Sequence, residues 1–109
     1  MGKEDTSTTS IGCLHIKYGE LLIEDGKNSF SLTPRESELL KYLIENQNTV
    51  VKREEILEEL WGQNDYFLGR SMDVFISRLR KYLQAEPSVS LETKRGVGFI
   101  FKISSHTPQ

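Results

Sequence analysis

The pattern of apolar residues along this 109-residue chain changes twice, and this change constrains the fold more than any other feature. Apolar and polar side chains alternate in residues 13–32, which is typical of half-buried antiparallel strands. In residues 33–83 apolar side chains recur every three or four positions, as on one face of an amphipathic helix. Residues 89–103 form two short strand-like segments around a glycine-rich turn. The order predicts three strands, three helices and a C-terminal hairpin.

Turn residues divide the strand-like segments. Asp25 and Gly26 predict a tight turn because glycine accepts a positive φ, and Gly96 and Gly98 predict the turn of the final hairpin. The predicted strands are residues 13–18, 20–24, 28–32, 89–95 and 99–103.

The start of the first helix is marked at residues 33–36. Thr33 can cap the helix, Pro34 suits its first position, and Glu36 follows Thr33 by three residues, as a capping box requires. We expect this helix to end near residues 46–48. Its apolar stripe comprises Leu39, Leu40, Leu43 and Ile44.

Two more helices are predicted before the hairpin. The second spans residues 53–61 and ends at Gly62, because glycine is favoured just past a helix end. Residues 62–69 are expected to form a loop bounded by two glycines, and the third helix is expected over residues 70–83. Three helices closed by a β-hairpin predict an α+β fold, a winged helix-turn-helix with a small N-terminal antiparallel sheet.

The composition, 37% hydrophobic and 28% charged, fits one soluble domain, which we assign to residues 11–104. Residues 1–10 are expected to be a flexible linker remnant and residues 105–109 a disordered tail. The single cysteine, Cys13, has no internal disulfide partner, and no residue cluster indicates a metal or cofactor. Because no apolar run approaches the ~20 residues needed to span a bilayer and no leader is visible, we expect a cytoplasmic protein without membrane association.

Charge is unevenly distributed along the chain. The formal net charge is −2, but residues 1–69 hold 7 basic and 13 acidic side chains, whereas residues 70–102 hold 7 basic and 3 acidic ones. Because salt screens charges over about 8–10 Å, a local basic face matters more to a polyanion than the total charge. The asymmetry indicates a basic face on an acidic protein; the alternative is a charge gradient without a partner.

The third predicted helix has two distinct faces when its residues are placed about 100° apart. The buried stripe should be Met72, Ile76, Leu79 and Leu83. The opposite face carries Arg70, Val74, Ser77 and Lys81, with Arg78 beside them. This face is basic and nearly free of acidic residues, so we expect it to enter the major groove of DNA. A solvated basic face without a partner is the alternative.

Residue chemistry suggests individual roles on this face. Arg78 is the best candidate for a guanine edge because its forked donors match O6 and N7. Val74 could touch a thymine methyl group, and Arg70 and Lys81 are expected to meet phosphates. The flanking Asp73 and Arg80 are expected to make intramolecular pairs.

The final hairpin places basic residues near its tip. Thr93, Lys94 and Arg95 lead directly into the Gly96 turn. An arginine at such a tip can enter the minor groove, where the potential is most negative at A·T tracts. Edge cations that keep a hairpin soluble are the alternative.

The motifs along residues 20–103 resemble, in order and in combination, the winged-helix effector domain of OmpR/PhoB-type response regulators. They are Leu32-Thr33-Pro34-x-Glu36, Leu60-Trp61-Gly62, Asp73-Val74 followed by Leu79-Arg80-Lys81, and Arg95-Gly96-x-Gly98-Phe99. The resemblance implies a sequence-specific DNA-binding output domain of a bacterial two-component system that regulates transcription. It also implies that the third helix enters the major groove and that Arg95 enters the minor groove, with Thr93 near the backbone or a base edge.

Further contacts and partners are implied by this resemblance. Trp61 would donate its indole N–H to a phosphate, and packing in the core at the helix end is a second role that it could fill as well. The 62–69 loop would contact RNA polymerase through Asn64, Asp65, Tyr66 and Phe67, with Tyr66 and Phe67 as lids over the core as the alternative. Family members bind direct repeats as head-to-tail dimers, although an isolated effector domain can be monomeric. A receiver domain and a histidine kinase belong to the intact system.

Two other classes of function remain open at this point. A winged helix can bind another protein through the same surfaces, since fold alone does not decide function. An enzyme is disfavoured because His15 and His106 have no Ser, Asp or Cys arranged around them, and the Gly96–Gly98 turn lacks the following helix of a phosphate-binding loop. We therefore expect no enzymatic activity.

Overall fold

The N-terminal strands pair in chain order into an antiparallel sheet, β1–β2–β3–β4. The computed structural model describes residues 8–62 and 66–104. The strands span Thr8–Ile11, Leu14–Lys17, Leu22–Glu24 and Ser29–Ser31. A single 3₁₀ turn, η1 (Tyr18–Glu20), replaces the expected start of the second predicted strand.

Strand β1 is a correction to the sequence expectation. Residues 8–10 were assigned to the flexible lead, yet Thr8 pairs with Lys17 and Thr9 with Ile16 across the ladder. Their polar side chains show no alternation, so the strand depends on backbone pairing with β2, which residue patterns do not reveal.

Helices α1 (Pro34–Glu45) and α2 (Arg53–Trp61) confirm the predicted bounds. The capping box is present in full, because the Glu36 backbone N–H donates to Thr33 Oγ1 at 3.1 Å and the Thr33 N–H donates to Glu36 Oε1 at 3.0 Å. Gly62 ends α2 in the left-handed conformation, at φ 74°.

Helix α3 spans Tyr66–Leu83 and begins four residues before the predicted start. The 62–69 loop prediction was therefore wrong for residues 66–69, while residues 63–65 lie outside the described part of the chain. Gly69 led to the late predicted start, but one interior glycine costs a helix only about 1 kcal/mol. The predicted buried stripe is confirmed, since Met72, Ile76, Leu79 and Leu83 all lie in the core.

A second antiparallel sheet has the order β5–β7–β6, with strands Val50–Lys52, Gly98–Ile103 and Val89–Lys94. The β6–β7 hairpin is the predicted wing, and the three-residue β5 was not predicted. Gly98 is required where β5 and β7 meet, because a Cβ there would lie 2.0 Å from the Val51 carbonyl oxygen.

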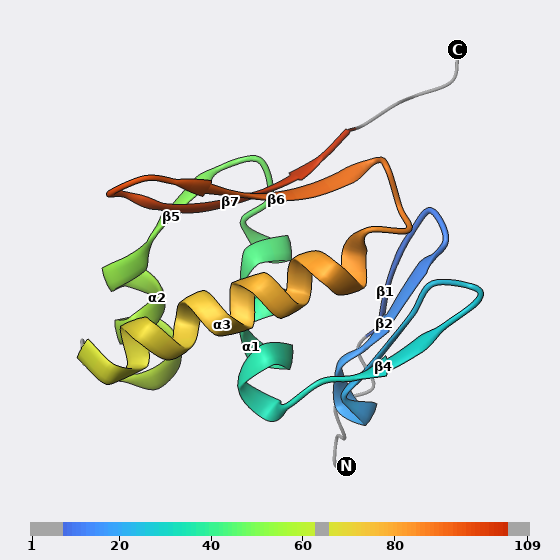
Figure 1. Ribbon diagram of the computed structural model, residues 1–109, viewed down its shortest axis with the longest axis horizontal. Coiled ribbons are helices and arrows are strands. Elements are labelled where there is room, and N and C mark those ends of the chain that lie inside the picture. Colours follow the sequence, from blue (N-terminus) through green and yellow to red (C-terminus); the bar gives the residue numbers. More distant parts are fainter. Residues whose placement is uncertain (1–7, 63–65, 105–109) are drawn as a thin grey trace.

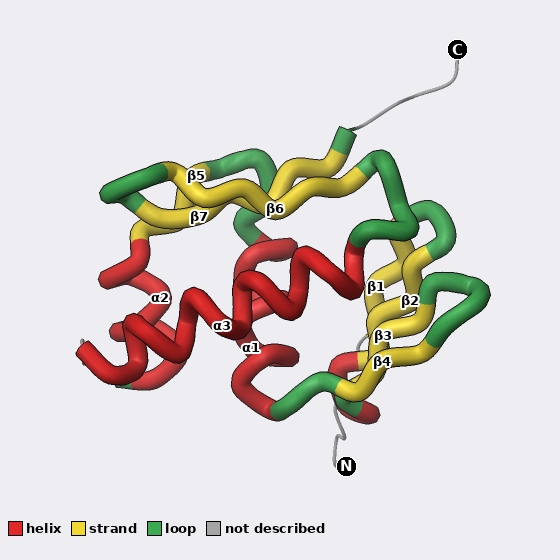
Figure 2. The backbone as a smooth tube through the Cα atoms, in the orientation of Figure 1, coloured by secondary structure: helices red, strands yellow, loops and turns green. Residues whose placement is uncertain are grey.

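The elements are arranged around α3 (Figure 1). It crosses in front of α1, with the three-stranded sheet above it and the N-terminal sheet at its C-terminal end. Figure 2 shows the two sheets as separate groups of strands, the three-stranded sheet above the helices and the N-terminal sheet to their right. Both sheets and all three helices contribute side chains to one core. In residues 8–62 and 66–104, no helix is long and apolar enough to cross a membrane.

Candidate nucleic-acid interface

The face of α3 opposite its buried stripe lies on the protein surface. Val74 is 48% exposed, and Ser77 and Lys81 are also exposed. Arg70 belongs to the first half of α3, and its side chain lies outside those the structure describes. The described part of the predicted contact face is thus accessible, and it includes an exposed apolar residue that the core does not use.

The Arg78 side chain is partly exposed to solvent and also makes an ion pair. Its side chain is 53% exposed, while its Nη1 lies 3.3 Å from Oε2 of Glu36, whose side chain is 1% exposed. The sequence pattern identified Glu36 only as part of a capping box. Its second partner could not be found from sequence, because it comes from a helix 42 residues later.

The residues that flank the exposed face of α3 are tied to neighbouring elements. Arg53 Nη2 of α2 donates to Asp73 Oδ1 at 2.8 Å. Arg80 Nε donates to the Leu91 carbonyl oxygen at 2.7 Å, and Arg80 Nη2 donates to Thr93 Oγ1 at 2.6 Å. The predicted intramolecular pairing of Asp73 and Arg80 is confirmed, and it fixes α3 against both α2 and the wing.

The wing brings its predicted residues to one end of the hairpin. Arg95 is exposed beside the turn, where Gly96 has φ 74°. Lys94 Nζ lies 3.5 Å from Glu92 Oε1, so part of its charge is balanced within the strand. Thr93 accepts the hydrogen bond from Arg80 described above. Of the two basic residues, Arg95 is therefore more open to a partner than Lys94.

A cleft of about 490 Å³ separates α3 from the wing tip. Its walls come from α2, α3 and the hairpin, so it lies between the two surfaces predicted to touch DNA. The lining residues are Arg53, Glu54, Asp73, Thr93, Lys94, Arg95, Gly96, Val97 and Gly98.

Trp61 lies at the other flank of α3. Its ring meets Phe75 edge-on at 6.2 Å, and the guanidinium carbon of Arg35 lies 5.0 Å from the ring centroid. The indole Nε1 is shielded from solvent and has no hydrogen-bond partner within the described residues. The core-packing interpretation of Trp61 therefore agrees with the structure, whereas donation to a phosphate requires the side chains over Nε1 to move. Nothing in the sequence pattern marks Arg35 as its neighbour.

The predicted polymerase-contact residues are placed only in part. Asn64 and Asp65 lie outside the described residues, and Tyr66 and Phe67 form the first turn of α3 instead of a loop. Elsewhere in the described ranges, no group of three or more His, Cys, Asp or Glu side chains could hold a metal ion.

Comparison with known proteins agrees with the architecture. The family model described as "Transcriptional regulatory protein, C terminal" matches residues 26–101. The transcriptional regulatory protein YclJ of Bacillus subtilis is 41% identical over 98 residues, which cover 90% of this chain and 43% of YclJ. The chain spans roughly two fifths of the length of the curated relatives it matches.

Two solved structures show the same fold. The Klebsiella pneumoniae RstA DNA-binding domain, solved in complex with the RstA box, superposes with a TM-score of 0.68 at 31% identity, covering 87% of this chain and 96% of that one. The Thermotoga maritima response regulator DrrB, an OmpR/PhoB homologue, gives a TM-score of 0.69 at 30% identity, covering 87% of this chain and 44% of DrrB. The chain therefore belongs to the family of transcriptional regulatory protein C-terminal domains, with the winged-helix fold of OmpR/PhoB-type response regulators.

Proposed function

We propose that this chain binds double-stranded DNA at specific sequences and serves as the output domain of a two-component response regulator. The observation that carries the proposal is the exposed face of α3, where Val74, Ser77 and Lys81 are accessible while the flanking Asp73 and Arg80 are bound to other elements. The structure of the related RstA DNA-binding domain was determined in complex with its DNA box, which supports this interpretation.

The dimensions of α3 suit the major groove. An 18-residue helix is about 27 Å long at 1.5 Å per residue, and the groove, ~12 Å wide, admits one helix. In this arrangement Arg78 reads a guanine edge and Val74 meets a thymine methyl group. Arg70, Ser77 and Lys81 contact the backbone or adjacent edges.

The wing and Trp61 extend the proposed contact to either side of α3. Arg95 inserts into the minor groove, and Thr93 and Lys94 approach the backbone beside it. The indole N–H of Trp61, which no described residue accepts, donates to a phosphate once the side chains that shield Nε1 move aside on binding, which would satisfy a donor that is costly to leave unbonded.

The partners of the intact protein form the second part of the proposal. We assign the folded module to residues 8–104, which includes β1. The intact protein would lie in the cytoplasm. Its receiver domain, itself controlled by a histidine kinase, would regulate the binding of head-to-tail dimers to direct-repeat operators. Asn64, Asp65, Tyr66 and Phe67 would contact RNA polymerase. The role is binding, without catalysis.

Selection of random duplexes on the purified chain tests the DNA-binding proposal. We expect one enriched motif, with half-sites at a fixed spacing when two copies bind. On the enriched duplex, log affinity should fall with log salt by about 0.9 per phosphate neutralised. Absence of an enriched motif, or binding that is indifferent to salt, would instead favour a protein-binding role.

A further inference from the structure

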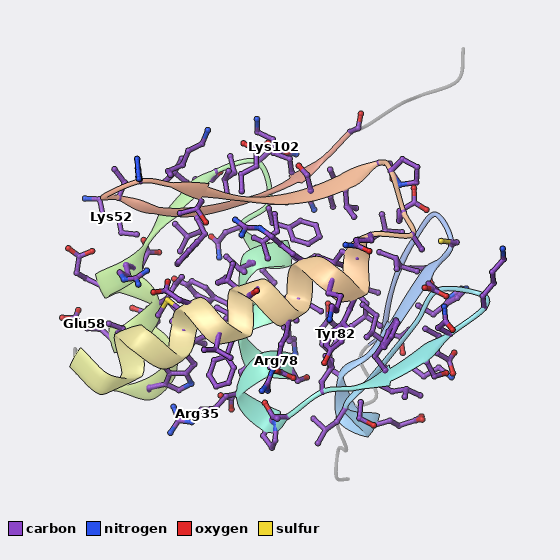
Figure 3. All side chains as sticks on the ribbon, viewed as in Figure 1. Arg35, Lys52, Glu58, Arg78, Tyr82 and Lys102 are labelled. Carbon is purple, nitrogen blue, oxygen red and sulfur yellow. The ribbon has the colours of Figure 1, made fainter. Side chains whose placement is uncertain are left out.

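Glu36 is a buried carboxylate that lies between the start of α1 and the middle of α3. Its two oxygens have different partners, because Oε1 accepts the Thr33 backbone N–H at 3.0 Å and Oε2 lies 3.3 Å from Arg78 Nη1. With only 1% of the side chain exposed, the carboxylate has little access to water. Figure 3 shows Arg78 on the side of α3 where α1 begins, together with Tyr82 and Arg35.

The capping box alone does not explain a buried charge at this position. Glutamine closes a capping box as well as glutamate does, and a carboxylate is costly to bury unless it is paired. The negative charge therefore has its counterpart in Arg78, whose guanidinium carries five donors. Because one terminal nitrogen faces Glu36 and half of the side chain stays exposed, donors remain for a second partner.

The backbone around Arg78 is held in place from both sides. Phe75, almost one turn earlier, meets the Trp61 ring, and Tyr82, one turn later, stacks on Phe30 with centroids 4.7 Å apart. The helix is thus fixed on the same flank that carries the ion pair. The backbone at Arg78 is therefore fixed, and only the Arg78 side chain, which is proposed to contact the base, can still change its conformation.

We propose that Glu36 is a positioning residue that orients the Arg78 guanidinium for reading one base pair. The inference rests on the proposed role of Arg78 at DNA. A guanidinium held at one edge loses less freedom on meeting a guanine and turns less readily to a nearby phosphate. Glu36 thus favours specific over non-specific binding, since its negative charge also opposes general attraction to the backbone.

The variant Glu36→Gln separates positioning from capping. The amide keeps an oxygen for the Thr33 N–H but removes the charge that faces Arg78. We expect affinity for unrelated duplexes to rise, while discrimination at the base pair read by Arg78 falls about 3- to 10-fold, part of the roughly 5- to 150-fold that a bidentate contact is worth. Substitution of a purely structural residue would not raise the affinity for unrelated duplexes while lowering the discrimination at one base pair.

Two control variants isolate the effect. Thr33→Ala removes the other half of the capping box but leaves the ion pair, so its melting temperature should fall without loss of discrimination. Glu38→Gln changes the net charge equally from an exposed position on α1, so any gain in non-specific affinity there should come without a change at the reading position.

The experiment uses the duplex that the unaltered chain enriches from a random pool, together with all its single-base-pair substitutions. Dissociation constants are measured for the unaltered chain, Glu36→Gln, Arg78→Ala and the double variant. We expect Glu36→Gln to lose discrimination at the same position as Arg78→Ala, and the double variant to lose no more than Arg78→Ala. Unchanged discrimination in Glu36→Gln, equal loss at every position, or additive losses would each overturn the inference.

Failure of the inference is distinguishable from failure of the proposed function. If no duplex is enriched, the proposed function and the inference both fall. If Arg78→Ala binds an enriched duplex like the unaltered chain, the proposed role of Arg78 and the inference fall but DNA binding stands; if only Glu36→Gln has no effect, the inference alone falls. NMR of the unaltered chain provides a test that needs no folded variant. Slow rotation of the Arg78 guanidinium is expected, and free rotation in the absence of DNA would contradict the positioning role.

Discussion

At the scale of single residues, exposure separates those that stabilise α3 from those available to a partner. Leu79 is fully buried, and Val74, five residues earlier on the same helix, is nearly half exposed. The same helix thus offers an aliphatic side chain in each environment. Substitutions at the two positions should affect different properties of the protein.

Leu79→Ala should lower the free energy of unfolding by roughly 2–5 kcal/mol, because truncation of a buried leucine leaves a cavity. Val74→Ala should change it by less than about 0.5 kcal/mol, since the site is on the surface. Urea denaturation of both variants provides the measurement. A similar loss for both would contradict the assignment of buried and exposed faces.

Arg78→Ala should weaken binding to the enriched duplex by roughly 1–3 kcal/mol and relax discrimination at one base pair. Lys27→Ala is the matched control, because it removes a cation from an exposed turn of the N-terminal region. Fluorescence anisotropy with substituted duplexes measures both effects. Equal losses for the two variants would mean that Arg78 contributes only general charge.

At the scale of elements, sequence predicted those features whose causes are local. The capping box at Thr33, the stop at Gly62 and the stripe on α3 depend on residues within a few positions of one another, and the structure confirms each. Strands β1 and β5 were missed because their partners supply the pairing. The same limit hid the Glu36–Arg78 and Arg35–Trp61 contacts, which join different helices.

Within the wing, Arg95→Ala should weaken binding most on duplexes with A·T-rich flanks, where the narrow minor groove concentrates negative potential. Titrations on duplexes that differ only in the flank measure the effect. Lys102→Ala removes a cation from β7 that pairs with Glu92 instead of lying at the turn, and it serves as control. An equal loss on A·T-rich and G·C-rich flanks would argue against minor-groove insertion.

The pairing of β5 with the wing makes a further prediction. Gly98→Ala places a Cβ against the Val51 carbonyl oxygen, so the two strands must separate. The loss of stability should exceed that of Gly96→Ala, where the added Cβ meets nothing and only the positive φ costs roughly 1–2 kcal/mol. Thermal unfolding of both variants tests this order, and the reverse order would contradict the close approach.

At the scale of the whole molecule, Glu86 connects the N-terminal sheet to the turn that follows α3. Its carboxylate accepts hydrogen bonds from the Ser88 hydroxyl at 2.6 Å and the Cys13 backbone N–H at 2.8 Å. These bonds, with the one from the Ser88 hydroxyl foremost, lower the pKa of Glu86 from 4.5 to about 2. The link joins residues 73 positions apart, so no local pattern could have predicted it.

This depressed pKa predicts a dependence of stability on pH. Because the folded protein binds the proton less readily than the unfolded chain, the contribution of Glu86 is full above about pH 4.5. It is lost as the pH falls toward about 2. The difference in unfolding free energy between the unaltered chain and Glu86→Gln should therefore shrink between pH 6 and pH 3. A difference that stays constant over this range would exclude the ionised carboxylate as its source.

The two hydrogen bonds from Arg80 to the wing predict a limit on the duplexes that the proposed interface can engage. They join the hairpin to α3, so the major-groove and minor-groove contacts proposed above lie at a set separation along the double helix. Each inserted base pair lengthens the DNA by 3.4 Å and also rotates one groove relative to the other. An operator lengthened by one base pair between the two proposed contacts would then satisfy only one of them, so binding is expected to depend on the spacing of the two contacts as well as on the sequence.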